Sequence, residues 1–307
     1  MHSVEDPRTM AAISIIDPHQ HFWQLDAPHG YPWLQKRPLG PSVAGDIARI
    51  AHDYLLDDYL ADTRGFDVVK SVHVEAIARD PIGETRWLQE MADSRGFPHG
   101  IVARRELHLP GVEAELAQLR QFPNVRGIRH IVNWHKDPKV TYIDRADLLT
   151  DADWLRGFAL LRKYGLSFDL QLYPSQMQDA AGVAHRHPDI SIILNHAGMP
   201  VDRDAAGLAE WRSGMRALAA NQNVTVKISG LGMVDWHWTT EGIRPFVLET
   251  IDIFGVDRAM FASNFPVDKI YSDFRTLYDA FFEIVQSFSE AEKVKMFHDN
   301  AARIYRI

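Results

Sequence analysis

Eight short apolar runs, rich in β-branched residues, alternate along this chain of 307 residues with segments of helical periodicity. The runs cover residues 13–16, 68–76, 100–103, 125–132, 166–172, 190–194, 224–228 and 258–262. The helical segments cover residues 84–94, 112–119, 154–164, 208–220, 243–254 and 274–288. Eight strands that alternate with helices predict a (β/α)8 TIM barrel. An open doubly wound sheet is the alternative, although no Gly-x-Gly-x-x-Gly turn follows the first run.

Three further segments complete the expected organisation. Ser289 and Glu292 have the spacing of a capping box, which predicts a last helix beginning there. Residues 22–56 form a long insertion rich in Pro, Gly and aromatic residues, which we interpret as a lid or pocket wall. Residues 1–12 are polar and lack an apolar signal core, so we expect a flexible tail before a single domain at residues 13–307.

Composition narrows the classes of partner. The net charge of -8 argues against broad nucleic-acid binding. The chain has no cysteine, which excludes disulfides and thiolate sites and suits the reducing cytoplasm that we predict as its location. No apolar stretch is long enough to span a bilayer. We therefore expect a small-molecule substrate, and neither a nucleic acid nor a membrane as a partner.

A His-x-His pair follows the first predicted strand. Side chains two apart on a strand point the same way, so His19 and His21 should emerge together at its carboxyl end. Barrel enzymes build their active sites at that end. A neutral imidazole binds zinc well and exchanges protons near neutral pH. His185 and His187 have the same spacing, but they lie near the end of a predicted helix and are interpreted as solvated surface.

Polar side chains also occur at the ends of the second and fourth predicted strands. Alternation places Glu75 on the same face as His73, where it could bind metal, act as a base or hold a hydroxyl group. A structural pair with a nearby arginine is the alternative. Arg129 and His130 point to opposite faces, so one of them should enter the pocket. Arg129 could clamp a substrate carboxylate or form an ion pair at the rim.

The later strands add four candidates. Tyr173 ends the fifth strand, where Asp169 is expected to make structural hydrogen bonds. His196 follows a buried apolar strand and precedes a small turn, which is a strong placement for a site residue. Lys227 on the seventh strand could neutralise an anion in the pocket or form a buried ion pair. Asn264 follows the eighth strand.

Aromatic side chains in the predicted loops suit a sugar ring or an unsaturated ring, and packing against the core is the alternative for each. They are Trp23, Tyr31, Trp33, Trp134, His135, Trp236, His237 and Trp238. Together with Tyr173, we expect Trp23 to contact substrate.

These motifs resemble the amidohydrolase superfamily, specifically its amidohydrolase-2 branch of sugar-lactone and dicarboxylate-lactone hydrolases. The resemblance runs from about His19 to the end of the chain. It is carried by Asp17-Pro18-His19-Gln20-His21-Phe22-Trp23, Tyr31-Pro32-Trp33-Leu34, Val74-Glu75-Ala76, Leu194-Asn195-His196-Ala197-Gly198, Lys227-Ile228-Ser229-Gly230 and Phe261-Ala262-Ser263-Asn264-Phe265-Pro266-Val267. The resemblance implies a distorted (β/α)8 barrel, hydrolysis of a lactone, and a site lined by the histidines of strands one and six and by an eighth-strand aspartate.

The chain departs from the family pattern at that aspartate. The family's usual Ser-Asp-Trp-Pro is replaced here by Ser-Asn-Phe-Pro, with Asn264 at the aspartate position. An ionised aspartate can take a proton from the attacking water, whereas a neutral amide cannot. Either Glu75, His196 or Asp268 supplies the base, or the chemistry differs.

The amide of Asn264 is also a poorer metal ligand than a carboxylate, because it brings no charge. No lysine in the chain is clearly a metal-bridging residue, so a two-metal site is not expected. The resemblance implies one divalent ion, zinc by preference, held by His19 and His21, or no metal.

The leading hypothesis is a hydrolase that opens the lactone of a small anionic substrate, derived from a sugar acid or from aromatic catabolism. Water would attack the carbonyl, His196 would assist, and Arg129 or Lys227 would bind a carboxylate. A lactone isomerase or a decarboxylase on the same barrel is one alternative, since an isomerase needs no hydrolytic water. A non-catalytic small-molecule-binding protein is the other, although the retained histidines and Glu75 argue against it.

Overall fold

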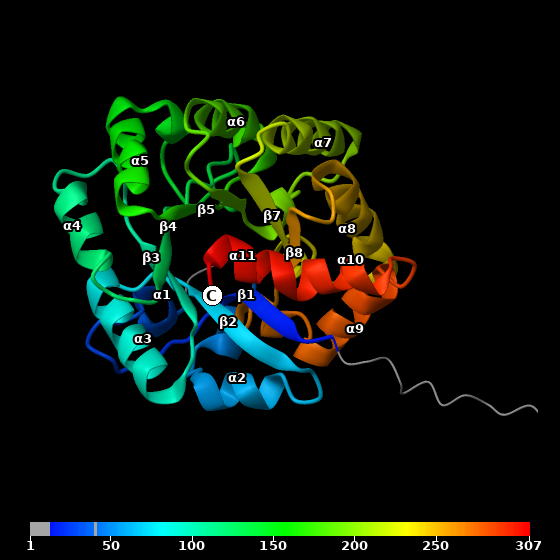
Figure 1. Cartoon of the computed structure of the whole chain (residues 1–307), viewed down its shortest axis with the longest axis horizontal. Helices are drawn as coiled ribbons and strands as arrows, with labels where there is room; N and C mark the ends of the chain where they lie inside the picture. The colour runs from blue at the N-terminus through cyan, green and yellow to red at the C-terminus, as the bar shows by residue number, and fades with distance from the viewer. Residues whose placement is uncertain (1–12, 40–41) are drawn as a thin grey trace, which may run out of the picture.

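The structure is a computed structural model that describes residues 13–39 and 42–307, so the expected tail at residues 1–12 lies outside the described residues. Eight parallel strands form one sheet in the order of the sequence. They are β1 (Ile15–Gln20), β2 (Val68–Val74), β3 (Gly100–Arg104), β4 (Val125–Arg129), β5 (Ser167–Leu170), β6 (Ile192–Leu194), β7 (Val224–Ile228) and β8 (Ala259–Phe261). A bridge from Gln20 to Phe265 brings the two ends of the sheet together (Figure 1). The predicted (β/α)8 barrel is confirmed, and the open sheet is excluded.

Helices surround the barrel (Figure 1). They are α1 (Pro32–Gln35), α2 (Leu56–Asp62), α3 (Pro81–Arg95), α4 (Val112–Leu119), α5 (Ala152–Tyr164), α6 (Met177–Arg186), α7 (Ala205–Ala219), α8 (Thr240–Phe254), α9 (Phe274–Ile284), α10 (Glu290–Val294) and α11 (Asn300–Tyr305). Ser289 and Glu292 form the predicted capping box at the start of α10. The chain leaves the helical conformation after Ile284, four residues before the predicted end of α9 at residue 288.

Most strand residues are buried on both faces, as expected for parallel strands covered by helices, whereas β2 begins with three residues that are not buried. On the outer face, Phe168 of β5 packs edge-on against Trp154 and Phe158 of α5, with ring centroids 5.6 and 5.3 Å away. Inside the barrel, apolar side chains from the strands pack against Ile304 and Tyr305 of α11. The C-terminal helix therefore closes the end of the barrel that faces the viewer in Figure 1, at the amino ends of the strands.

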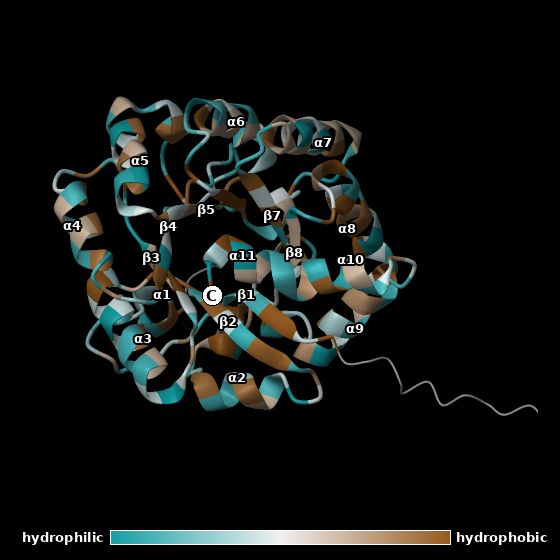
Figure 2. Cartoon of the chain, in the orientation of Figure 1, coloured by the Kyte–Doolittle hydropathy of each residue, from teal (hydrophilic) through white to brown (hydrophobic). Residues whose placement is uncertain are grey.

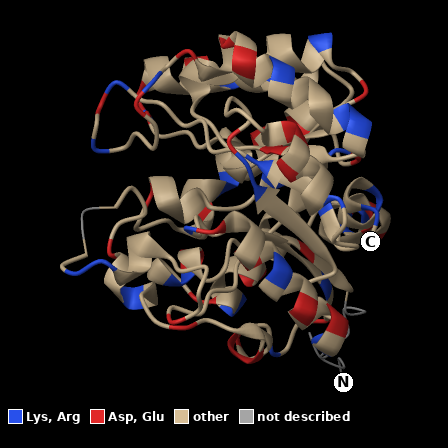
Figure 3. Ribbon diagram, turned by 90° about the vertical axis from the view of Figure 1, so that its left-hand side faces the viewer, with Lys and Arg blue, Asp and Glu red and all other residues tan. Residues whose placement is uncertain are grey.

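The surface shows the complementary pattern. Hydrophobic residues concentrate on the strands and on the helix faces that cover them, while hydrophilic residues cover the outer faces (Figure 2). Basic and acidic residues are interspersed over the helices and loops seen in Figure 3. No helix in the described part of the chain combines the length and apolar character needed to cross a membrane.

Candidate active site

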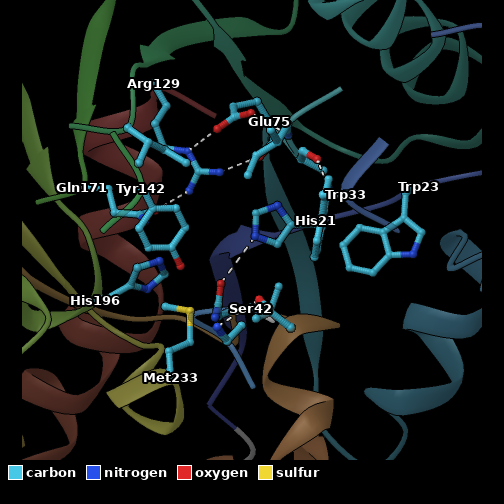
Figure 4. A pocket seen from close by; sticks show the side chains of 16 residues that line it. His21, Trp23, Trp33, Ser42, Glu75, Arg129, Tyr142, Gln171, His196 and Met233 are labelled. Carbon is cyan, nitrogen blue, oxygen red and sulfur yellow. Dashed lines mark hydrogen bonds and ion pairs between the residues drawn. The ribbon is translucent and has the colours of Figure 1, made fainter. Parts of the chain in front are cut away.

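A pocket opens at the carboxyl ends of the strands, where side chains from seven of the eight strand-end loops meet (Figure 4). It is lined by His21, Trp23, Trp33, Ser42, Ala44, Glu75, Ala76, Ile77, Arg129, Ile131, Tyr142, Gln171, His196, Met233, Asn264 and Val267. The insertion after β1 supplies Trp23, Trp33 and the 42–44 segment, so it forms a pocket wall as predicted.

The three expected histidines come together at the pocket floor. The ring centroid of His19 lies 5.1 Å from that of His21 and 4.6 Å from that of His196. The register of β1 against β2 is irregular between Asp17 and Gln20, and such an irregularity re-aims side chains at the end of a strand. His21 and His196 line the pocket, whereas His19 lies behind them and is fully buried.

Burial keeps these imidazoles uncharged at neutral pH. It lowers the pKa of His21 to about 3, with Arg129 contributing, and it holds the pKa values of His19 and His196 well below their usual range. Nδ1 of His21 lies 2.6 Å from the carbonyl oxygen of Val74, so Nδ1 carries the proton and donates it to that oxygen. Nε2 of His21 is therefore an acceptor.

Asn264 faces this acceptor. Its Oδ1 lies 3.4 Å from Nε2 of His21, and its Nδ2 donates to Oδ1 of Asp268 at 3.1 Å. Asn264 has a φ of 57°, a left-handed conformation that asparagine tolerates better than most residues. The arrangement leaves two acceptor atoms side by side, to which a single water molecule can donate both of its protons.

Asp268 lies behind Asn264, outside the pocket lining. Burial raises the pKa of Asp268 to about 7. Its Oδ2 is buried and has no hydrogen-bond partner among the residues described.

Arg129 and Glu75 form a buried ion pair in the pocket wall. The guanidinium donates from Nε to Oε1 of Glu75 at 2.7 Å and from Nη2 to the Glu75 carbonyl oxygen at 2.6 Å. A third bond runs from Nη1 to Oε1 of Gln171 at 2.9 Å. A guanidinium has five N–H groups, so Arg129 keeps two of them for a ligand.

The carboxylate of Glu75 is occupied at both oxygens. Oε2 accepts a hydrogen bond from the backbone N–H of Ile77 at 2.7 Å, while Oε1 accepts from Arg129. Glu75 follows the last residue of β2 and turns into the pocket, whereas His73 turns outward to within 3.9 Å of Glu84 on α3. The predicted alternation of His73 with Glu75 therefore breaks where the strand ends.

Lys227 lies beneath the pocket, inside the barrel. Its Nζ donates to Oδ1 of Asp169 at 2.5 Å, and it lies 3.4 Å from Nδ1 of His19. The hydroxyl of Tyr305 approaches both oxygens of Asp169, at 3.0 and 3.1 Å. Of the two alternatives for Lys227, the structure has the buried ion pair.

The aromatic candidates separate into different roles. Trp23 lines the pocket and packs edge-on against Trp33, with ring centroids 5.6 Å apart. Tyr173 donates its hydroxyl proton to the carbonyl oxygen of Val140, so it anchors the loop that follows β4 and does not line this pocket. Tyr142, from that loop, was not predicted; it stands between Arg129 and His196 with its hydroxyl toward the cavity (Figure 4).

The donor set fits a divalent cation poorly. Nε2 of His19 is buried without a partner, and Nε2 of His21 is an acceptor, but the third neighbour is the uncharged amide of Asn264. The ammonium group of Lys227 lies 3.4 Å from Nδ1 of His19, and its positive charge repels a metal ion at that ring. In residues 13–39 and 42–307, no three or more His, Cys, Asp or Glu side chains are grouped so as to hold a metal ion.

The structure combines a (β/α)8 barrel with a pocket at the carboxyl ends of the strands, which is where TIM-barrel enzymes have their active sites. Neutral histidines, an amide and one arginine line this pocket. The chain belongs to the amidohydrolase family Amidohydro_2, which it matches over residues 16–307. The predicted family membership is therefore confirmed.

Two relatives illustrate the similarity in sequence. The uncharacterized protein y4mH of Sinorhizobium fredii is 47% identical over 300 residues, covering 97% of this chain and 100% of that protein. An L-fucono-1,5-lactonase of Burkholderia multivorans is 31% identical over 311 residues, covering 95% of this chain and 96% of that protein.

Solved structures agree on the fold. An amidohydrolase from Burkholderia multivorans, crystallised with bound zinc, has a TM-score of 0.80 and 28% identity, covering 96% of this chain and 99% of that one. A probable 2-pyrone-4,6-dicarboxylic acid hydrolase from Acinetobacter baumannii has a TM-score of 0.72 at 13% identity, covering 96% of this chain and 100% of that one. At that identity the second likeness concerns the barrel alone.

Proposed function

We propose that this protein hydrolyses a small, uncharged lactone derived from a sugar acid. The observation that carries the proposal is the Arg129–Glu75 pair, which faces the neutral acceptors His21, His196 and Asn264 across one pocket. The relatives that bear the name L-fucono-1,5-lactonase support a sugar lactone as the substrate class.

The charge balance of the site favours an uncharged substrate over the anionic one expected from sequence. Arg129 is paired with Glu75, and Lys227 is paired with Asp169 beneath the floor. The histidines of the site are neutral because burial lowers each pKa. A dicarboxylate would therefore enter a pocket whose positive charges are already balanced.

Arg129 is assigned to the carbonyl group. Arg129 lines the pocket and keeps two N–H groups for a ligand, and Glu75 and Gln171 fix the plane of the guanidinium. Negative charge develops on the carbonyl oxygen as water adds, and a preorganised cation stabilises that charge more than it stabilises the ground state.

The attacking water is assigned to the opposite side of the pocket. One of its protons is held by Oδ1 of Asn264, which lies 3.4 Å from Nε2 of His21, and the other is directed at Nε2 of His196. We assign the proton transfer to His196, whose Nδ1 is bonded to Oγ of Ser229 at 2.9 Å and whose ring borders the cavity. The water oxygen bonds to the carbonyl carbon while its proton passes to Nε2 of His196.

Collapse of the tetrahedral adduct completes the reaction. The bond between the carbonyl carbon and the ring oxygen breaks, and His196 returns its proton to the departing alkoxide. The product is the open-chain hydroxy acid, with one water molecule consumed. A buried imidazolium is a strong acid, which suits this second transfer. The proposed steps involve no metal, because the donor set fits one poorly.

The test is a substrate panel with the purified protein. L-Fucono-1,5-lactone, D-glucono-1,5-lactone and 2-pyrone-4,6-dicarboxylate are followed by acid release at constant pH, in water labelled with oxygen-18. We expect hydrolysis of the sugar lactones, with one labelled oxygen in the product, and little turnover of the dicarboxylate. Ring migration without label would establish an isomerase instead, and efficient turnover of the dicarboxylate alone would refute the uncharged substrate class.

A further inference from the structure

A second hollow lies beside the catalytic pocket, over the carboxyl ends of β3 and β4. Ile77, Ile131 and Tyr142 line both hollows, so the two share a wall. The polar side chains of the second hollow include Arg104, Glu106, His108, His130 and Arg145. The hydrolytic steps assigned above use none of these polar groups.

His130 faces this hollow because it follows Arg129, and adjacent residues of extended chain point to opposite faces. Its Nδ1 accepts hydrogen bonds from the indole Nε1 of Trp154 at 3.1 Å and from the backbone N–H of Leu107 at 3.3 Å. Burial lowers the pKa of His130 to about 3, so the ring is neutral and its single proton is on Nε2. Within the described chain, no hydrogen bond from Nε2 is present.

His108 stacks beside His130, with ring centroids 5.5 Å apart and an interplanar angle of 16°. Nδ1 of His108 is buried and has no partner among the residues that the structure describes. Buried polar atoms nearly always have a hydrogen-bond partner, and leaving them without one costs stability. Nδ1 of His108 is covered by protein, so the donor that this pair offers to a polar ligand in the hollow is Nε2 of His130.

Both arginines around the hollow are already paired, and Asp144 also lines it, with no ion pair among the described residues. Arg104 forms an ion pair with Glu106. Arg145 bonds to Asp147 at 2.7 Å and to Asp151 at 2.8 Å. Paired groups keep donors and acceptors available while giving little net charge, which suits hydroxyl groups better than an anion.

The shared wall adds an aromatic surface. The ring of Tyr142 borders both hollows, and a tyrosine face packs well against the apolar face of a sugar ring. A ligand that occupied both hollows would pass this residue.

We propose that the second hollow is a subsite for a further uncharged sugar ring, attached to the lactone that the catalytic pocket holds. Substrates would then be lactones of disaccharide-derived aldonic acids, with the outer ring bonded to Nε2 of His130. This inference rests on the proposed lactonase function and narrows its substrate class.

The test compares kcat/KM for D-glucono-1,5-lactone with kcat/KM for cellobiono- and gentiobiono-1,5-lactone, which carry a glucosyl group at O4 and O6. We expect at least one disaccharide lactone to be preferred by about tenfold, the scale of one or two hydrogen bonds. The variant His130→Asn keeps an acceptor for Trp154 and removes the Nε2 donor. It should lower the disaccharide-to-monosaccharide ratio about fivefold, whereas the exposed control His185→Asn should keep the ratio of the parent.

A second variant guards against misfolding of the first. Ile143 lines the second hollow but not the catalytic pocket, so Ile143→Trp should fill the subsite and bring the ratio close to one. A parent ratio near one, with the monosaccharide lactone still hydrolysed, would overturn the subsite and leave the proposed function standing.

If no lactone of the panel is hydrolysed, the proposed function fails, and calorimetry with methyl β-cellobioside and methyl β-gentiobioside decides the subsite. Saturable binding of either glycoside that Ile143→Trp abolishes supports it. Absence of binding by both overturns it.

Discussion

Asn264 donates a hydrogen bond to Asp268 at 3.1 Å and turns its amide oxygen toward His21. A carboxyl group thus stands directly behind the amide that occupies the family's aspartate position. Burial raises the pKa of Asp268 to about 7, so this group already exists partly protonated near neutral pH. A second carboxyl group at position 264 would face Asp268 at hydrogen-bond distance, and the pair would share a proton.

We expect Asn264→Asp to lower the rate of lactone hydrolysis near neutral pH. The amide oxygen that accepts a hydrogen bond from water would be replaced by a carboxyl group that shares a proton with Asp268. The left-handed backbone at this position suits aspartate nearly as well as asparagine, so the fold should persist. The measurement is kcat/KM across pH on a lactone that the parent hydrolyses. A rise of about two orders of magnitude, on the scale of a general base, would show that no other group takes the proton.

Exchanging the two side chains tests whether the pair of carboxyl groups, and not the loss of the amide at position 264, lowers the activity. The double variant Asn264→Asp with Asp268→Asn again contains one carboxyl group and one amide. Its activity should exceed that of the single Asn264→Asp variant if the carboxyl pair is the cause of the loss. Asp252→Asn, exposed on α8, is the matched control and should resemble the parent.

We expect Arg129→Lys to lower kcat by about a hundred- to a thousandfold, the cost of removing an oxyanion donor. Lysine cannot bond to Glu75 and Gln171 while also presenting two N–H groups to the carbonyl oxygen. Arg126→Lys, on the same strand but bonded outside the pocket to Pro123, is the control. A change confined to KM would indicate that Arg129 binds a ground-state group, such as a substrate carboxylate, instead.

The barrel was predictable because buried parallel strands are nearly continuous apolar runs, and each run of the sequence became a strand. Helix ends were less predictable. Phe288 continues the apolar pattern of α9, yet the helix ends at Ile284 and Phe288 packs against the core from the turn beyond it. Periodicity records which side chains are buried, and it does not record whether a helix or a turn buries them.

Residues at strand ends were predictable in part. Alternation predicted that only one of Arg129 and His130 would enter the pocket, and the structure shows that it is Arg129. The partner of Lys227 was not, because Asp169 lies 58 residues away on β5 and only the closed barrel brings the two together. Tyr142 sits in a long loop without periodicity, so no sequence pattern indicated that it lines the pocket.

Glu84 gives a prediction for stability. It is buried near the start of α3, where it accepts a hydrogen bond from the backbone N–H of Ala76 at 3.1 Å. Burial raises the pKa of Glu84 from 4.5 to about 8. Folding therefore favours its protonated form, so this stabilisation is complete below the unfolded pKa and is lost as pH rises through the folded one.

The melting temperature of Glu84→Gln, measured relative to that of the parent, should increase as pH rises from 4.5 to about 8. At lower pH the difference between the two melting temperatures should be constant. Comparing the two proteins at each pH cancels the contribution of the buried histidines, which acid destabilises in both. Glu90→Gln, exposed on the same helix, should track the parent throughout. A difference between Glu84→Gln and the parent that does not vary with pH would contradict the raised pKa of Glu84.

The last prediction concerns zinc. We expect the metal-free protein to bind at most one zinc ion weakly, because His19 and His21 bring no charge, Asn264 brings none, and the Lys227 ammonium lies 3.4 Å from His19. Asn264→Asp should bind zinc more tightly, since a carboxylate then joins the two imidazoles. Calorimetric titration of both proteins measures the affinities, and hydrolysis before and after dialysis against a chelator measures the dependence of activity on metal. Tight binding of two ions, or activity that a chelator abolishes and zinc restores, would refute this account of the site.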